Sequence, residues 1–174
     1  MANHLFDAIR AVASPDATFI ETAEGRRWTY GDMIALSGRL AGALSALGVE
    51  PGDRVAVQVE KSPEALMLYL ACLRAGAVYL PLNTAYTLAE LDYFIGDAAP
   101  RLVVVDPKSR DGVEPIARAH GGVVETLDAT GGGSLLQRAG GEAADFADAD
   151  RGPDDLAAIP STPRARPAAP RGRC

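Results

Sequence analysis

The residues of this chain that could do chemistry are few and scattered. The stretch TGGGS (130–134) could cradle a phosphate, because consecutive glycines let backbone N–H groups approach an anion closely. It does not follow a convincing strand, as a phosphate loop must, so a flexible surface loop is the simpler interpretation. His4 and His120 have no nucleophile or metal ligand near them in the sequence, and neither is assigned a catalytic role.

A second group of candidates lies at Glu60, Lys61 and Ser62, between a predicted strand and a predicted helix. Ser62 suits the N-cap of that helix, which accounts for it without a ligand. Glu60 and Lys61 lie where open α/β sheets bind ligands, but position alone does not assign them a ligand-binding role. Four tyrosines are interpreted as packing residues with a polar end rather than as a base-stacking surface: Tyr69, Tyr79, Tyr86 and Tyr93. We therefore assign no catalytic, cofactor-binding or metal-binding residue.

The elements that position these residues alternate between strand and helix from residue 54 onward, which predicts a parallel, helix-covered sheet of the α/β class. The expected strands are 54–60, 77–82, 100–106 and 122–127, and the expected helices are 63–75, 87–98 and 112–119. Before them we expect a helix at 3–13, a hairpin within 17–30 and a helix at 30–47. Residues 138–152 are expected to form a surface loop, and DLAAI (155–159) the start of another buried strand.

Some finer features are also predicted. In the first helix, Leu5, Ile9 and Val12 should lie on one apolar side. The apolar stretch 65–82 is interrupted by Arg74 and Gly76, so we expect it to form a helix and a strand rather than a membrane span.

Charge and cysteine content narrow the class of protein. Four of the 17 Lys and Arg residues lie in 160–174 and none of the 23 Asp and Glu residues do, so residues 1–159 carry a net charge of −10. An acidic body argues against non-specific nucleic-acid binding. Cys72 and Cys174 are too far apart for a disulfide framework or a zinc site. The N-terminus has no continuous apolar stretch typical of a signal peptide, and we expect a cytoplasmic protein.

The motif series TY–helix–GV–PGDRVA, RAGAVYLPLNTAY and ELDYFIGDA, with RGPDDLAAI after it, resembles the N-terminal part of the adenylate-forming (AMP-binding) acid–CoA ligases over residues 15–106 and on to 159. Within that family the segment 60–94 is most similar to malonyl-CoA synthetases. The resemblance implies an incomplete N-terminal subdomain, 1–159, of the adenylate-forming ligase fold, followed by a Pro/Arg-rich tail, 160–174, that we expect to be disordered.

The resemblance also implies a reaction. A small carboxylic or fatty acid, for example malonate, is adenylated by ATP with Mg²⁺, and CoA then displaces AMP to give an acyl-CoA. In the family, ATP is held by a loop of the type YTSGTTGxxKG, which should begin near residue 160. The chain instead continues PSTPRARPAAPRGRC. Because that loop and every downstream residue of the family are missing from this chain, we expect no ATP, Mg²⁺ or CoA to be bound by it and no ligase activity.

Residues 160–174 admit an explanation from the genetic code. With suitable synonymous codons, reading from the third base of codon 160 spells Leu-Tyr-Thr-Ser-Gly-Thr-Thr-Gly-Arg-Ser-Lys-Gly, the expected loop. The last two bases of each shifted codon are largely set by the next residue, so little freedom remains. The hypothesis is a frameshift after Ile159. The alternative is a non-enzymatic α/β binding protein whose Pro/Arg-rich tail, with its PAAP element (167–170), contacts a partner.

Overall fold

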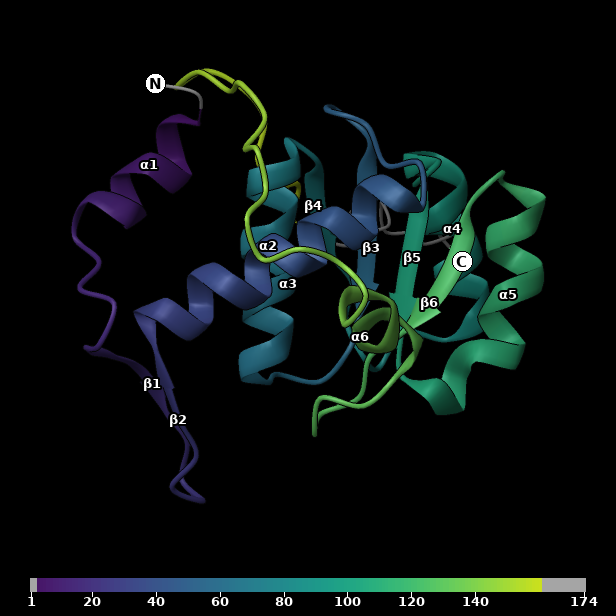
Figure 1. The fold of residues 1–174 in the computed structure, drawn as a ribbon. Helices are drawn as coiled ribbons and strands as arrows, with labels where there is room; N and C mark the ends of the chain where they lie inside the picture. The colour runs from purple at the N-terminus through teal and green to yellow at the C-terminus, as the bar shows by residue number, and fades with distance from the viewer. Residues whose placement is uncertain (1–2, 161–174) are drawn as a thin grey trace, which may run out of the picture.

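A four-stranded parallel sheet forms the centre of the fold in a computed structural model that describes residues 3–160 (Figure 1). The strands are β3 (Arg54–Gln58), β4 (Val78–Pro81), β5 (Leu102–Val105) and β6 (Val123–Thr126), in the order β4-β3-β5-β6. Val57 of β3 pairs with Val104 of β5, and Val104 pairs in turn with Glu125 of β6. The predicted parallel sheet from residue 54 onward is confirmed.

Helices cover both faces of this sheet. One face carries α1 (His4–Ala11), α2 (Tyr30–Ala46), α3 (Pro63–Ala75) and α6 (Ser134–Ala139), and the other carries α4 (Leu88–Ala98) and α5 (Arg110–Ala119), which follows the 3₁₀ turn η1 (Pro107–Ser109). Side chains of β5 alternate between the two cores. Leu102 and Val104 face the α2/α3 layer, Val103 and Val105 face the α4/α5 layer, and all four are fully buried. This explains the uninterrupted apolar run in the sequence.

The caps predicted from the sequence define the helices that flank β4. Ser62 caps α3 by accepting a hydrogen bond from the N–H of Ala65 at 3.0 Å, and Pro63 occupies the first turn. The helix ends at Gly76, whose φ of 70° is a left-handed conformation that costs glycine little. Thr87 and Glu90 form a reciprocal capping box at the start of α4.

The N-terminal hairpin is not part of the parallel sheet. β1 (Thr18–Glu21) and β2 (Arg27–Thr29) form an antiparallel hairpin, as expected. It projects beyond the N-terminal end of α2 (Figure 1). The prediction for α1 was wrong in one respect, because Leu5 and Val12 are 42% and 77% exposed. The buried residue of α1 is Phe6. Its ring lies against a buried guanidinium, a tertiary partner that helical periodicity alone does not reveal.

The C-terminal part differs from the predictions in two ways. The expected surface loop at 138–152 begins within α6, which takes its first two residues, and the remainder is exposed or half-buried and packs against α2. Residues 157–159 do join β4 in parallel, through an isolated bridge between Tyr79 and Ala158. They are half-buried rather than buried, and Leu156 is 56% exposed. Residues 161–174, and with them the frameshift hypothesis, lie outside the described residues.

Candidate functional site

The candidate site is a crevice at the carboxyl ends of β3 and β4. It arises because β3 continues into α3 on one face of the sheet and β4 into α4 on the other, so the two connections diverge. The cavity between them has a volume of about 770 Å³. Its walls are the segments 59–62 and 82–84 that leave the two strands. Ligands of open α/β sheets bind outside the carboxyl ends of the strands, and the crevice lies at that edge of the sheet.

The floor of the crevice is apolar and aromatic. Tyr69 of α3 and Tyr79 of β4 pack edge to face with ring centroids 5.2 Å apart, and Leu66 lies beside them, 38% exposed. Burial raises the pKa of the Tyr79 phenol to about 12. Its hydroxyl therefore stays protonated near neutral pH and is unsuited to act as a base. The interpretation of the four tyrosines as packing residues is confirmed for Tyr69, Tyr79 and Tyr86, which stacks on Phe94, whereas Tyr93 is 64% exposed.

The polar rim brings the three sequence candidates together. Glu60 and Lys61 line the crevice and are exposed, whereas the Ser62 hydroxyl oxygen accepts the capping hydrogen bond from the N–H of Ala65. Gln58, a residue not singled out from the sequence, is buried at the end of β3. Its side-chain amide donates to the carbonyl of Asn83 at 2.9 Å and so holds the opposite wall. Gln58 could have been noticed in the sequence because it is a polar residue at the end of the apolar strand RVAVQ.

The donor set of this rim does not fit a triphosphate with Mg²⁺. The Lys61 ammonium is the one cation among the residues that line the crevice, and the Glu60 carboxylate beside it in the sequence adds a negative charge that opposes phosphate binding. Among residues 3–160 no group of three or more His, Cys, Asp or Glu side chains could hold a metal ion. We therefore derive no catalytic step from these residues.

The other candidates lie away from the crevice. TGGGS forms a turn between β6 and α6, with positive φ at Gly131 and Gly133. A Cβ on Gly133 would lie 2.3 Å from the Thr126 carbonyl oxygen, so close backbone packing requires this glycine. His120 Nε2 lies 3.0 Å from Asp92 Oδ1 in an exposed pair, and His4 is exposed in α1. Neither histidine contacts a nucleophile within the described part of the chain.

The chain returns to the crevice at its last described residues. The N–H of Tyr79 donates to the carbonyl of Ala157 at 3.0 Å, and the N–H of Ile159 donates to the carbonyl of Tyr79 at 3.0 Å. Residues 157–159 thereby extend the sheet by one short parallel segment beside β4. Residue 160 consequently follows beside the carboxyl end of β4, directly after residues that bond to Tyr79, which itself lines the cavity.

Comparison with known proteins identifies this arrangement. The family model described as "AMP-binding enzyme" matches residues 8–162. The chain belongs to the AMP-binding enzyme family. The ATP-bound structure of MatB from Rhodopseudomonas palustris, a similar fold, superimposes with a TM-score of 0.87 at 54% identity, over 91% of this chain and 31% of that one.

Curated relatives of this AMP-binding enzyme chain include the long-chain-fatty-acid–CoA ligase FadD13 of Mycobacterium tuberculosis (strain CDC 1551 / Oshkosh). It is 32% identical over 147 residues, 84% of this chain and 29% of that ligase. Feruloyl-CoA synthase of Amycolatopsis sp is 37% identical over 62% of this chain and 22% of its own length. The chain thus spans less than a third of the length of these relatives. Within the described residues, no helix is long and apolar enough to cross a membrane.

Proposed function

We propose that residues 3–160 are the N-terminal section of an acid–CoA ligase that converts a carboxylic acid, ATP and CoA into an acyl-CoA, AMP and pyrophosphate. The observation that carries this proposal is the family match through residue 162, together with 54% identity to the ATP-bound MatB structure. A small acid such as malonate is the substrate we favour, on the resemblance of residues 60–94 to malonyl-CoA synthetases. A cytoplasmic location belongs to the same proposal.

We assign this section a scaffolding role in that reaction. It builds the first strands of the parallel sheet and brings residues 157–159 to the edge of β4, beside the crevice. A phosphate loop that begins at residue 160 would leave the sheet at its carboxyl edge, where glycine-rich loops bind phosphates in α/β folds. In this proposal, residues 3–160 position the start of the phosphate loop. The groups that contact ATP belong to the part of the ligase that would follow.

We further propose that residues 160–174 are the phosphate loop read in a shifted frame, which makes the chain as it stands inactive. The test is the nucleotide sequence from codon 155 onward, followed by expression of two proteins, the 174-residue chain and the product of the frame-restored gene. Malonate- and ATP-dependent acyl-CoA formation is expected only from the second. Activity of the purified 174-residue chain, or a shifted frame that does not encode the loop, would contradict the frameshift.

The alternative is a binding protein with a purposeful Pro/Arg-rich tail, for which PAAP (167–170) is the supporting feature. It predicts a partner that binds the whole chain and is lost when residues 160–174 are removed. A frame-restored enzyme without ligase activity, combined with such a partner, would favour this alternative.

A further inference from the structure

The segment that leads to the crevice, residues 142–155, crosses the helical layer before it reaches β4. We call it the return segment. It leaves α6, passes over α2 and α3, and runs close to the start of α1 (Figure 1). Its path decides where residues 157–159 meet the sheet. The contacts that hold it are therefore candidates for a positioning role.

Helix α2 holds the first part of the return segment by close backbone approach. A Cβ on Gly38 would lie 2.0 Å from the Ala144 carbonyl oxygen, far inside van der Waals contact. Arg39 Nη1 donates to the Glu142 carbonyl at 3.2 Å. One helical turn further, the atoms nearest to a Cβ on Gly42 would be those of the Glu142 side chain, from 3.1 Å. Gly38 thus marks the point where the return segment lies against the helix backbone.

Arg74 of α3 joins the return segment to both long helices. It is 2% exposed, and its Nε donates to Asp148 Oδ1 at 2.6 Å while Nη2 donates to the Phe146 carbonyl at 3.2 Å. Its Nη1 donates to the Ile34 carbonyl at 2.7 Å and the Ser37 hydroxyl at 3.2 Å. The guanidinium group therefore donates hydrogen bonds to α2 and to the return segment at the same time. A lysine ammonium cannot reproduce this planar geometry.

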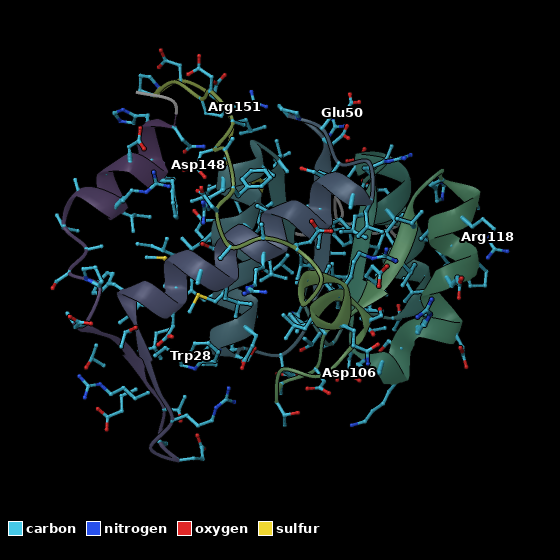
Figure 2. The ribbon with its side chains drawn as sticks, in the orientation of Figure 1. Trp28, Glu50, Asp106, Arg118, Asp148 and Arg151 are labelled. Atoms are coloured by element: carbon cyan, nitrogen blue, oxygen red, sulfur yellow. The ribbon has the colours of Figure 1, made fainter. Side chains whose placement is uncertain are left out.

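The contacts continue from Arg74 to the sheet edge. The Ala149 N–H donates to the Arg74 carbonyl at 2.7 Å, and Arg151 Nη2 donates to the Gly76 carbonyl at 2.7 Å. Asp148 and Arg151 lie along the part of the return segment near α1 (Figure 2). Six residues after Arg151, Ala157 accepts the hydrogen bond from Tyr79. The chain thus enters the edge of β4 directly after the segment that Arg74 holds.

We propose that Arg74 is a positioning residue that, through the return segment, sets where residues 157–159 join β4 and hence where the phosphate loop begins. The second half of this statement rests on the proposed function. Arg74 acts through Asp148 and Phe146, since it lies in the helical layer and does not line the crevice.

Amide hydrogen exchange of the 174-residue chain tests the first half. In Arg74→Lys and in Gly38→Ala, the amides of Tyr79 and Ile159 should exchange at least about tenfold faster, while Val104 in the buried strand keeps its protection. A matched control, Arg10→Ala, should exchange as wild type. It removes the half-exposed ion-pair partner of Asp148 and leaves the hydrogen bonds from Arg74 to the return segment in place.

Unchanged exchange at Tyr79 and Ile159 in both variants would overturn the proposal. Equal acceleration of every amide, Val104 included, would also overturn it, because Arg74 would then stabilise the whole domain instead of positioning its edge. The frame-restored ligase tests the second half. Gly38→Ala should raise the KM for ATP about tenfold and leave the KM for CoA unchanged, whereas loss of folded enzyme would lower kcat alone. An inactive restored ligase would overturn the proposed function, while the exchange comparison still decides the role of Arg74.

Discussion

Arg26 and Glu64 form an ion pair that fastens the N-terminal hairpin to the start of α3. Glu64 is 3% exposed, whereas the Arg26 side chain is 45% exposed, so one partner is buried and the other reaches it from the surface. Arg26 also lies over the ring of Trp28, 5.6 Å from its centroid. The hairpin is a separate two-stranded sheet and does not pair with the parallel sheet. This pair is one of the contacts that give it a defined position.

Loss of this arginine should destabilise the protein more than neutralisation of its partner. Arg26→Ala leaves a buried carboxylate without its cation and should lower the free energy of unfolding by about 1–3 kcal/mol. Glu64→Gln removes the charge together with the pair, so its cost should be smaller. Urea denaturation of both variants checks the order. A larger loss for Glu64→Gln would mean that the pair itself, and not the buried charge, dominates.

The capping box of α4 predicts a loss of stability in acid. The Thr87 backbone N–H, and next its hydroxyl, donate to the Glu90 carboxylate and hold its pKa below the ordinary value of 4.5. A lowered pKa in the folded state contributes stability that is present above pH 4.5 and is lost as the pH falls through the folded-state value. Melting temperatures of Glu90→Gln should therefore depend less on pH below 4.5 than those of wild type. Glu50→Gln, at an exposed glutamate, should follow the wild-type curve.

Alanine substitutions at two glycines with positive φ should distinguish the stability cost of backbone strain from that of steric crowding. Gly25 and Gly76 have φ values of 80° and 70°. A Cβ on Gly25 would meet nothing within 4 Å, whereas one on Gly76 would lie 2.8 Å from Arg151 Nε. Gly25→Ala should cost about 1 kcal/mol from the left-handed conformation alone, and Gly76→Ala at least about 1 kcal/mol more. Equal melting temperatures for the two variants would contradict the crowding at Gly76.

The Cys72 thiol should be unreactive toward alkylating reagents in the folded protein. It is fully buried in α3, and burial raises the pKa of its thiol, so almost no thiolate is available near neutral pH. In a Cys174→Ser variant, which leaves Cys72 as the sole thiol, iodoacetamide should label the protein only after denaturant is added. Mass spectrometry of the labelled protein measures this. Rapid labelling without denaturant would show that α3 opens readily.

Most of the regular structure could be predicted because its signals are local. The caps at Ser62 and Thr87 act over three residues, and the apolar run of β5 reports burial on both faces directly. The parallel order of strands followed from their alternation with helices. The family resemblance likewise rested on motifs in a fixed order, and the match over residues 8–162 confirmed it.

The candidate site could be predicted only in part. Glu60, Lys61 and Ser62 were placed correctly at the end of a strand, but the wall opposite them depends on Gln58 reaching Asn83, which is 25 residues away. The helix α6 was missed because it is six residues long and lies within a Gly- and Ala-rich stretch. Short helices owe their stability to packing more than to propensity, so composition gives little warning of them.

By itself, the sequence determined most of the element types, their parallel arrangement and the family, since each of these depends on residue type and local spacing. Only the tertiary structure decided the course of residues 142–159. Arg74 looked like an interruption in an apolar helix, yet it is buried among acceptors from α2 and the return segment. The physical reason is that a buried charge is tolerated only where distant parts of the chain converge to satisfy it, and local spacing does not record that convergence.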